Sequence, residues 1–206
     1  MELYIRGKYL RETRSFYDNA DNIKVITGLR RCGKSSLTKM IRMELIDADI
    51  DASHIIYIDL ELRKYRKIKT ADQLEALIED SICDAGLNYL FIDEIQNVKN
   101  FEEVINEFRK EGKCSIFITG SNSYLLSGEL TTKLTGRYIE FEMYPLTFEE
   151  YEQMKEFYGI DIDSNPAITE HSGHLRRHIQ CYRYRAYYYC SVILHCVIPI
   201  ILTLFR

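Results

Sequence analysis

Hydrophobic residues along the chain fall into two alternating patterns, short unbroken runs and longer stretches with helical spacing. The short runs are rich in β-branched and aromatic residues and predict strands at 23–27, 54–60, 89–92, 115–119 and 138–143. Apolar residues spaced three and four positions apart predict helices at 3–18, 37–45, 71–83, 101–110, 123–134 and 147–157. Because strands and helices alternate, we expect an α/β fold in which right-handed crossovers join the strands of a parallel sheet.

Polar residues mark the starts of two of these helices. Thr70 stands directly before the helix at 71–83 and is a candidate N-cap. Thr147 and Glu150 have the spacing of a capping box, in which each side chain accepts a hydrogen bond from the backbone N–H of the other residue. We therefore expect the last helix to begin at Thr147.

The strand at 23–27 runs directly into a glycine-containing loop, and a helical pattern follows that loop. The loop reads G-x-x-x-x-G-K-S, the Walker A pattern, and comprises Gly28, Leu29, Arg30, Arg31, Cys32, Gly33, Lys34, Ser35 and Ser36. A phosphate-binding loop is expected between a strand and a helix, so this context supports nucleotide binding. The alternative is a glycine turn that only joins a strand to a helix.

Each part of the loop has a chemical role in binding a nucleotide. Gly28 and Gly33 permit backbone angles and a close approach that a Cβ atom would block. Successive backbone N–H groups would form an anion-binding nest at the positive end of the following helix. The ammonium of Lys34 would reach the β- and γ-phosphates, and the hydroxyl of Ser35 would be a ligand of Mg²⁺.

Two carboxylates, Asp93 and Glu94, follow the apolar strand at 89–92 in the manner of a Walker B motif. A buried parallel strand delivers its next residues to the carboxyl edge of the sheet, where ligands bind. We expect Asp93 to hold Mg²⁺ and Glu94 to accept a proton from the attacking water. The alternative is that these acids only begin a loop. The GTPase motifs D-x-x-G and N-K-x-D do not occur at the expected places, which favours ATP.

Polar residues after two other strands are candidates for contacts with the γ-phosphate. Ser121 or Asn122, which follow the strand at 115–119, would sense the γ-phosphate or the lytic water, with Thr119 as the third choice. Such residues are also ordinary turn formers. Arg137 would stabilise transition-state charge at its own site or at that of a neighbouring subunit, or else lie on the surface.

Two further groups of cations are compatible with more than one role. Arg30 and Arg31 lie inside the loop and would contact phosphate or a partner, or remain solvated. The run at 63–69 contains five cations and Tyr65, which would stack on a base if the run bound nucleic acid. The alternative for this run is a solvated surface loop.

Charge is distributed unevenly along the 206 residues. The net charge is −4, yet all 31 acidic residues lie at or before Glu170, and five arginines follow it. The acidic main part argues against general electrostatic binding to nucleic acid. Six cysteines without C-x-x-C spacing indicate neither a zinc site nor a disulfide framework, and reduced thiols favour a cytoplasmic protein. Charged residues interrupt the first apolar positions, so no signal peptide is expected.

Together these stretches resemble the AAA-like P-loop ATPases of bacteria and archaea, in which an ATPase domain precedes a C-terminal domain of poorly defined function. The resemblance rests on residues 24–37, 89–98, 101–108, 116–126 and 134–151, the last of which is the most family-specific. It implies a three-layer P-loop NTPase sandwich whose five parallel strands have the order 5-1-4-3-2. It also implies the roles described above for Lys34, Ser35, Asp93, Glu94, Ser121, Asn122 and Arg137.

The resemblance ends near residue 165, which predicts an ATPase domain at 1–165 and an atypical tail at 166–206. The abrupt change in composition indicates a frameshifted or truncated reading frame. A rival interpretation is a membrane anchor, because residues 186–205 carry no charge and are long enough to cross a bilayer. His195 and Pro199 weaken that interpretation, and a buried helix or a partner-binding segment is the third one.

The sequence thus predicts an ATP-binding protein that hydrolyses ATP to ADP and phosphate with Mg²⁺. Two alternatives stay open, a nucleotide-dependent switch with little turnover and a subunit of a nucleic-acid-associated motor. Residues 93–96 (D-E-I-Q) and 119–121 (T-G-S) favour a motor, whereas a chain of this length supplies a single motor lobe. Assembly into a homo-oligomer is compatible with each of these functions.

Overall fold

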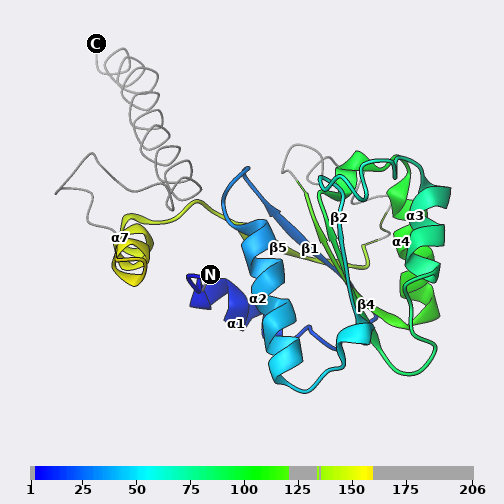
Figure 1. Ribbon diagram of the computed structural model, residues 1–206, viewed down its shortest axis with the longest axis horizontal. Helices are drawn as coiled ribbons and strands as arrows, with labels where there is room; N and C mark the ends of the chain where they lie inside the picture. The colour runs from blue at the N-terminus through cyan, green and yellow to red at the C-terminus, as the bar shows by residue number, and fades with distance from the viewer. Residues whose placement is uncertain (1–2, 121–133, 135, 160–206) are drawn as a thin grey trace, which may run out of the picture. The chain divides into compact units, whose positions relative to one another are not determined.

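The strands that the structure describes form one parallel sheet. The computed structural model describes residues 3–120, 134 and 136–159. In this part of the chain the sheet contains β1 (Ile23–Gly28), β2 (Ile55–Asp59), β3 (Asn88–Asp93), β4 (Cys114–Thr119) and β5 (Tyr138–Met143). All neighbouring strands pair in parallel, in the order β2-β3-β4-β1-β5 (Figure 1). This result confirms the α/β class and the predicted order 5-1-4-3-2.

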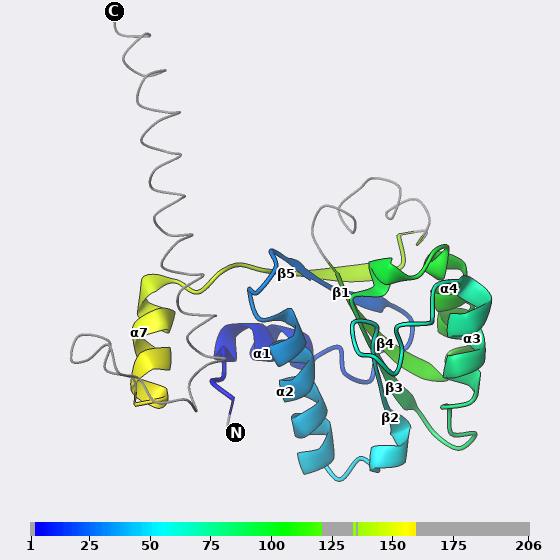
Figure 2. The same ribbon diagram turned by 45° about the horizontal axis from the view of Figure 1, so that its top comes forward.

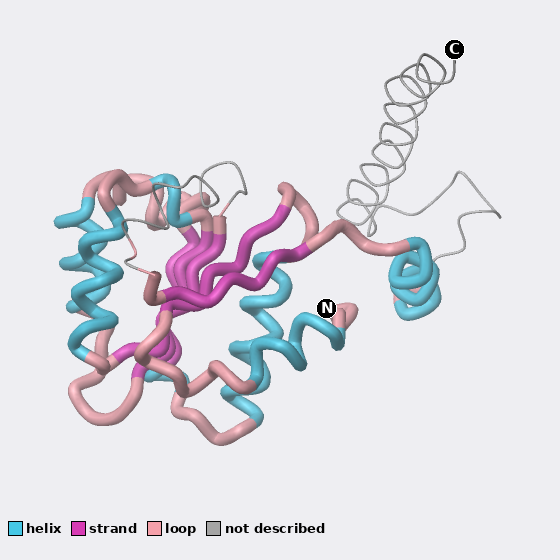
Figure 3. Tube along the Cα trace, turned by 180° about the vertical axis from the view of Figure 1, so that it is seen from behind, coloured by secondary structure: helices cyan, strands magenta, loops and turns pink. Residues whose placement is uncertain are grey.

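Helices cover both faces of this sheet. Helices α1 (Gly7–Arg14) and α2 (Lys34–Asp47) lie on one face, and α3 (Ala71–Glu79) and α4 (Phe101–Glu111) lie on the other, as Figures 1 and 2 show from two directions. The view from behind in Figure 3 shows the same three layers of helix, sheet and helix. The remaining described helices are α7 (Phe148–Phe157) and the short 3-10 helices η1 (Ala52–His54) and η2 (Ile95–Asn97).

Side chains of the central strands alternate between two hydrophobic clusters, one on each face of the sheet. On β3, Leu90 and Ile92 pack with α3 and α4, whereas Tyr89 and Phe91 pack with α1 and α2. The ring of Phe91 stacks on that of Phe117 in β4, with 4.9 Å between the ring centroids. Strands β1, β3 and β4 are buried along their whole length, which explains why their apolar runs are nearly unbroken.

Two helices are shorter than their periodicity predicted. The helix expected at 3–18 covers only the eight residues of α1, and α3 ends at Glu79 rather than at residue 83. The end of α3 has a clear cause, because the side chain of Asn88 accepts from the backbone N–H of Cys83 (3.0 Å) and donates to its carbonyl oxygen (2.9 Å). These bonds hold Cys83 beside Asn88 at the start of β3, a position that is incompatible with a longer α3. The helix predicted at 123–134 lies outside the described residues, apart from its last position.

Both predicted helix starts are confirmed. Thr70 is the N-cap of α3 and forms a capping box with Gln73, whose side chain also accepts from the backbone N–H of Lys69 (2.8 Å). Thr147 and Glu150 form the second capping box. The Thr147 hydroxyl accepts from the Glu150 N–H (3.1 Å), and the Glu150 carboxylate accepts from the Thr147 N–H (2.9 Å). The chain direction at the start of α7 is therefore fixed by reciprocal hydrogen bonds.

A buried lysine, Lys24, lies near the start of β1, at the opposite end of the strand from the G-x-x-x-x-G-K-S loop. The side chain of Lys24 is fully buried, and its ammonium donates to the carbonyl oxygens of Asn19 (2.5 Å) and Asn22 (3.1 Å) and to the hydroxyl of Ser115 (2.9 Å). It also lies 4.7 Å from the centre of the Phe117 ring. Burial lowers the pKa of Lys24 to about 7, because the charged form loses its hydration.

This lowered pKa predicts a stability that rises with pH. Above pH 7 the folded chain releases the Lys24 proton, whereas the unfolded chain, with a lysine pKa near 10.4, retains it. We expect the free energy of unfolding, relative to that of the Lys24→Met variant, to increase by about 2 kcal/mol between pH 7 and pH 9. Urea unfolding of both proteins at the two pH values measures this difference, and a difference that does not change with pH would contradict the lowered pKa.

The chain divides into two compact units, Met1–Tyr151 and Glu152–Arg206. The described part of the second unit continues α7 and contains an ion pair between Lys155 and Glu152, with 3.1 Å between nitrogen and oxygen. The tail predicted at 166–206, including the uncharged stretch at 186–205, lies outside the described residues. Among the helices that the structure describes, none combines the length and the hydrophobicity needed to span a membrane.

Candidate nucleotide-binding site

The loop between β1 and α2 has a backbone that requires its two glycines. Gly28 has a φ of 145° and Gly33 a φ of 108°, both in the region that side chains disfavour. A Cβ atom on Gly28 would lie 2.4 Å from the carbonyl oxygen of Met143 and 2.6 Å from Sγ of Cys32. The loop therefore approaches the end of β5 too closely for any other residue at this position.

Gly33 also determines where α2 begins. It is the N-cap of α2 in a left-handed conformation, and its carbonyl oxygen accepts from the Leu37 N–H (2.9 Å). The helix thus begins at Lys34, three residues before the first apolar position of the predicted helix. The first backbone N–H groups of a helix have no partner within the helix, so they are available to an anion at this end. Ser35 and Ser36, which carry two of these N–H groups, are half-buried.

The ammonium of Lys34 lies against the loop itself. It donates to the carbonyl oxygens of Gly28 (3.0 Å) and Leu29 (3.3 Å), and the side chain is 5% exposed. An ammonium has three donors, so these two bonds do not exhaust it. A positive charge is thus held beside the N-terminus of α2, where the helix dipole adds to its attraction for anions.

Asp93 and Glu94 lie at the carboxyl end of β3, where Thr119 of β4 links them. The Thr119 hydroxyl donates to Oδ1 of Asp93 and accepts from the backbone N–H of Glu94 (3.1 Å). The hydroxyl of Tyr57 in β2 donates to Oδ2 of Asp93 (3.3 Å). Asp93 is buried with a hydroxyl on each oxygen, an arrangement that fixes its carboxylate while leaving lone pairs for a metal ion.

Glu94 has an unusual backbone conformation. Its φ of 56° and ψ of 50° are left-handed, which is uncommon for a residue with a long side chain. The chain turns sharply here into η2, and the half-buried carboxylate accepts a hydrogen bond from the side chain of Gln96. Backbone strain of this kind is typical of functional sites, where it aims a side chain away from the regular strand direction.

Strand register brings the two halves of the site to one edge of the sheet. Gly28 pairs with Met143 at the ends of β1 and β5, and Asp93 pairs with Asp59 at the ends of β3 and β2. Because β4 alone separates β1 from β3, their ends are two strand spacings apart, or about 10 Å. This separation suits a triphosphate that reaches from the loop to the carboxylates.

Burial raises the pKa of two side chains near the site, the hydroxyl of Tyr57 and the thiol of Cys32. Burial and the nearby carboxylates of Asp93 and Asp59 raise the pKa of Tyr57, so its hydroxyl remains a donor to Asp93. Burial likewise raises the pKa of the Cys32 thiol, against the opposing effect of the Lys34 charge. The side chain of Cys32, a residue of the loop itself, is therefore a buried neutral thiol that packs in the core rather than a reactive thiolate.

The structure does not bring Arg137 together with Lys34. Arg137 is exposed and precedes β5, and its carbonyl oxygen accepts from the N–H of Ile23 at the start of β1 (3.0 Å). It therefore lies at the amino edge of the sheet, the full length of β1 or about 16 Å from Gly28. This placement argues against contact with the γ-phosphate of its own site and leaves the interpretation in which it reaches a neighbouring subunit.

Other predicted residues lie beside the site or outside the described part of the chain. Ser121 and Asn122 are outside the described residues, so Thr119, the third choice, is the only sensor candidate whose contacts are known. Arg30 is exposed and pairs with Glu61 at 3.7 Å, and Arg31 is exposed with a φ of 68°.

In the basic run at 63–69 the cations are exposed. Its aromatic residue, Tyr65, packs in part against the hydrophobic core and is covered by Lys64, which leaves its ring poorly placed to stack on a base.

Several residues of the site were not predicted from the sequence. Asp59 and Tyr57 reach Asp93 only through the pairing of β2 with β3, and Gln96 reaches Glu94 through the turn at η2. The sequence held a signal for Asp59, since it is a carboxylate near the end of the apolar run at 54–60 and ends β2 as Asp93 ends β3. No local pattern marks Arg6, which donates to the loop from 26 residues away.

A parallel sheet with a glycine loop after β1 and two acids after β3 defines the P-loop NTPase class. A family model described as an AAA domain matches residues 20–152. The chain therefore belongs to this AAA family, which confirms the resemblance to AAA-like P-loop ATPases. Membership indicates nucleotide binding and an ATPase-like function.

Relatives in two organisms match the same part of the chain. An uncharacterized protein of Haemophilus influenzae is 40% identical over 166 residues, which are 80% of this chain and 40% of that protein. An uncharacterized protein of Methanocaldococcus jannaschii is 36% identical over 137 residues, which are 66% of this chain and 30% of that protein. The chain thus spans two fifths or less of the length of these relatives.

Solved structures of low sequence identity share the fold. A DNA polymerase III gamma subunit-related protein of Thermotoga maritima has a TM-score of 0.53 at 13% identity, over 72% of this chain and 49% of that chain. Saccharomyces cerevisiae RIF2 has a TM-score of 0.52 at 17% identity, over 81% of this chain and 66% of that chain. At these identities the similarity establishes the fold alone.

Proposed function

We propose that the chain binds ATP and, with Mg²⁺, hydrolyses it to ADP and phosphate. One observation carries the proposal. The loop that holds Lys34 and the turn that holds Asp93 and Glu94 lie at the same edge of the sheet, with only β4 between them. A lysine inside an anion-binding loop and two acids one strand away are the parts that phosphoryl transfer to water requires.

The residues present fit a magnesium ion. The hydroxyl of Ser35 and the carboxylate of Asp93 are oxygen donors of the kind that Mg²⁺ prefers, and Mg²⁺ usually binds through one or two carboxylates plus phosphates and water. Asp93 is buried and oriented by Thr119 and Tyr57, so its position does not depend on the metal. When bound, Mg²⁺ would neutralise charge that develops on the phosphate oxygens.

Groups of the protein itself would bind the phosphates, accept the proton of the attacking water and sense the γ-phosphate. The backbone N–H groups at the start of α2 and the ammonium of Lys34 hold and neutralise the phosphates. Glu94 accepts the proton of the attacking water, a role that its half-buried carboxylate and its turn away from the strand both favour. The hydroxyl of Thr119 bonds to both Asp93 and Glu94 and so holds the two residues in position. Ser121 or Asn122, which follow Thr119 closely in the sequence, would sense the γ-phosphate.

The remaining predictions concern larger units. We also propose that the ATPase domain extends over residues 1–165 and that the sequence at 166–206 is not part of it. Assembly of several copies would let Arg137, at the amino edge of one subunit, stabilise transition-state charge in the site of the next. Because Arg137 lies about a full strand length from its own loop, an oligomer is the arrangement in which it would act on the reaction.

Titration of the full-length chain with ATP tests this function. At an ATP concentration of about 100 times Kd, ligand binding adds about 2.7 kcal/mol to the free energy of unfolding, which predicts a Tm increase of several degrees. We expect ATP to raise the Tm more than GTP. Phosphate release should require Mg²⁺, stop on addition of EDTA and resume when excess Mg²⁺ is restored. Binding without phosphate release would favour the nucleotide-dependent switch, and the absence of binding would contradict the proposal.

A further inference from the structure

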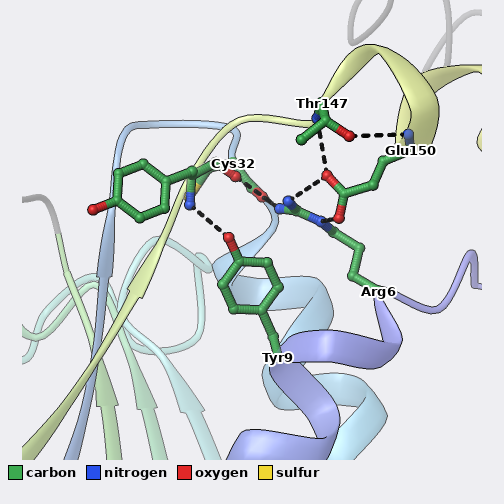
Figure 4. Close-up of polar contacts among 6 residues, drawn as sticks. Arg6, Tyr9, Cys32, Thr147 and Glu150 are labelled. Carbon is green, nitrogen blue, oxygen red and sulfur yellow. Dashed lines mark hydrogen bonds and ion pairs between the residues drawn. The ribbon is translucent and has the colours of Figure 1, made fainter.

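Arg6 lies behind the phosphate-binding loop in a buried position. It directly precedes α1 and is 7% exposed. One terminal nitrogen, Nη1, donates to the carbonyl oxygen of Cys32 in the loop (3.0 Å; Figure 4). The same nitrogen donates to the carbonyl oxygen of Tyr144 after β5 (2.8 Å). A single guanidinium thus joins the N-terminal segment, the loop and the end of the sheet, although these segments are far apart in the sequence.

A carboxylate and an aromatic ring hold this guanidinium in place. Nε and Nη2 of Arg6 donate to the two oxygens of Glu150 at 3.0 Å and 2.8 Å, in the bidentate geometry of an arginine–carboxylate pair. Glu150 is itself oriented by the capping box with Thr147 (Figure 4). The ring of Tyr9 lies 4.5 Å from the guanidinium, and its hydroxyl accepts from the Tyr144 N–H. The orientation of the Arg6 guanidinium is therefore fixed by Glu150 and by the Tyr9 ring, in addition to its bonds to the two carbonyl oxygens.

The bond to Cys32 has a consequence for the anion-binding face of the loop. In a trans peptide the C=O of one residue and the N–H of the next point in opposite directions. The peptide between Cys32 and Gly33 is trans, and Arg6 holds its carbonyl toward the back of the loop. The N–H of Gly33 is thereby directed toward the opposite side, which carries the N-terminus of α2.

This peptide would rotate easily without an external anchor. Rotation of this peptide changes φ of Gly33, which is 108°, and Gly33 has no Cβ and adopts almost all backbone angles at low cost. A rotated peptide would present a carbonyl oxygen to the phosphates instead of an N–H, and repulsion would weaken binding. A buried, charge-assisted hydrogen bond is well suited to prevent that rotation.

We propose that Arg6 is a positioning residue of the phosphate-binding loop, and that Glu150 acts through Arg6 as its counter-ion. The inference rests on the proposed function, since it assigns a role in ATP binding. It implies that the start of α7 and the loop are coupled through one side chain. Disturbing Glu150 should weaken ATP binding, although Glu150 itself is bonded to Arg6 and Thr147 rather than to the loop.

A matched pair of substitutions tests the role of Arg6. Arg14 ends α1 and also forms a bidentate pair, with Glu44 of α2 at 3.0 Å and 2.5 Å, but it is 53% exposed. Lysine keeps the charge and loses the planar fork, so Arg6→Lys and Arg14→Lys make the same chemical change at two sites. By calorimetry on the full-length chain, we expect Arg6→Lys to weaken ATP binding about ten- to a hundredfold, because a charge-assisted bond is lost. Arg14→Lys should bind ATP as the unmodified chain does.

The outcomes separate this inference from the proposed function. If the unmodified chain and Arg14→Lys both fail to bind ATP, the proposed function is wrong. If both bind ATP and Arg6→Lys binds it equally well, Arg6 does not position the loop. Circular dichroism and urea unfolding establish that each variant is folded, and the affinity is then compared per folded molecule.

A double-mutant cycle tests whether Glu150 acts through Arg6. We expect Glu150→Gln to weaken ATP binding in the unmodified chain, because the guanidinium loses its charged partner and its fixed direction. In the Arg6→Lys background the same substitution should have a smaller effect, since coupled residues are not additive. An equal effect in both backgrounds would show that Glu150 influences the loop independently of Arg6.

Discussion

Replacing Lys34 by alanine is expected to weaken ATP binding severely while the fold is retained. The ammonium of Lys34 lies against the loop, 3.0 Å from the carbonyl oxygen of Gly28, and the side chain is 5% exposed. A charge in such a site is worth more than a charge in water, because little solvent screens it. Loss of the charge-assisted bonds that we propose it makes to the β- and γ-phosphates should weaken ATP binding by about a hundredfold or more, as measured by isothermal titration calorimetry.

Lys39 provides the control for this substitution. It lies in the same helix, α2, but it is exposed, so Lys39→Ala removes an ammonium without changing the loop. We expect Lys39→Ala to bind ATP as the unmodified chain does. If the folded Lys34→Ala and Lys39→Ala variants bind ATP with equal affinity, Lys34 does not contact ATP. The proposal that the loop binds phosphate would then be wrong.

Replacing Glu94 by glutamine is expected to separate binding from turnover. Glutamine has the size of glutamate and can still bond to Gln96, but it cannot accept a proton from water at neutral pH. ATP affinity should therefore change little, whereas phosphate release should slow by about 10² to 10⁴, the usual contribution of a general base. Single-turnover measurement of phosphate release, with ATP binding measured on the same protein, tests both parts of this prediction.

Glu103→Gln is the matched control, because Glu103 is an exposed glutamate in α4. It should leave both binding and turnover unchanged. If Glu94→Gln releases phosphate as fast as Glu103→Gln, Glu94 is not the general base. ATP binding by the loop would still be expected, but another group would have to activate the attacking water.

Much of the fold could be predicted from local patterns. Strands β1, β3 and β4 are buried on both faces, so their apolar runs are conspicuous, and both capping signals sit at real helix starts. Helix ends were harder to predict, since the end of α3 depends on the side chain of Asn88, nine residues further on. The strand order came from the family resemblance, because apolar periodicity does not specify which strands are neighbours.

Only part of the candidate site, like only part of the fold, could be predicted from the local sequence. The glycines and Lys34 occupy one continuous segment, as do Asp93 and Glu94, and the chemistry of each segment is visible locally. By contrast, Thr119 became the link between the two acids only when β4 was placed beside β3. The place of Arg137 at the amino edge depends on the parallel pairing of β5 with β1.

The sequence by itself determined the class of the protein, because phosphate binding depends on backbone freedom at two glycines and on one lysine within a single loop. It also determined the alternation of strands and helices, since burial on two faces leaves a continuous apolar run. Only the tertiary structure decided which groups support that loop. Arg6, Tyr144 and Glu150 meet behind it because α1, the end of β5 and the start of α7 converge there, over separations of up to 144 residues that no local pattern records.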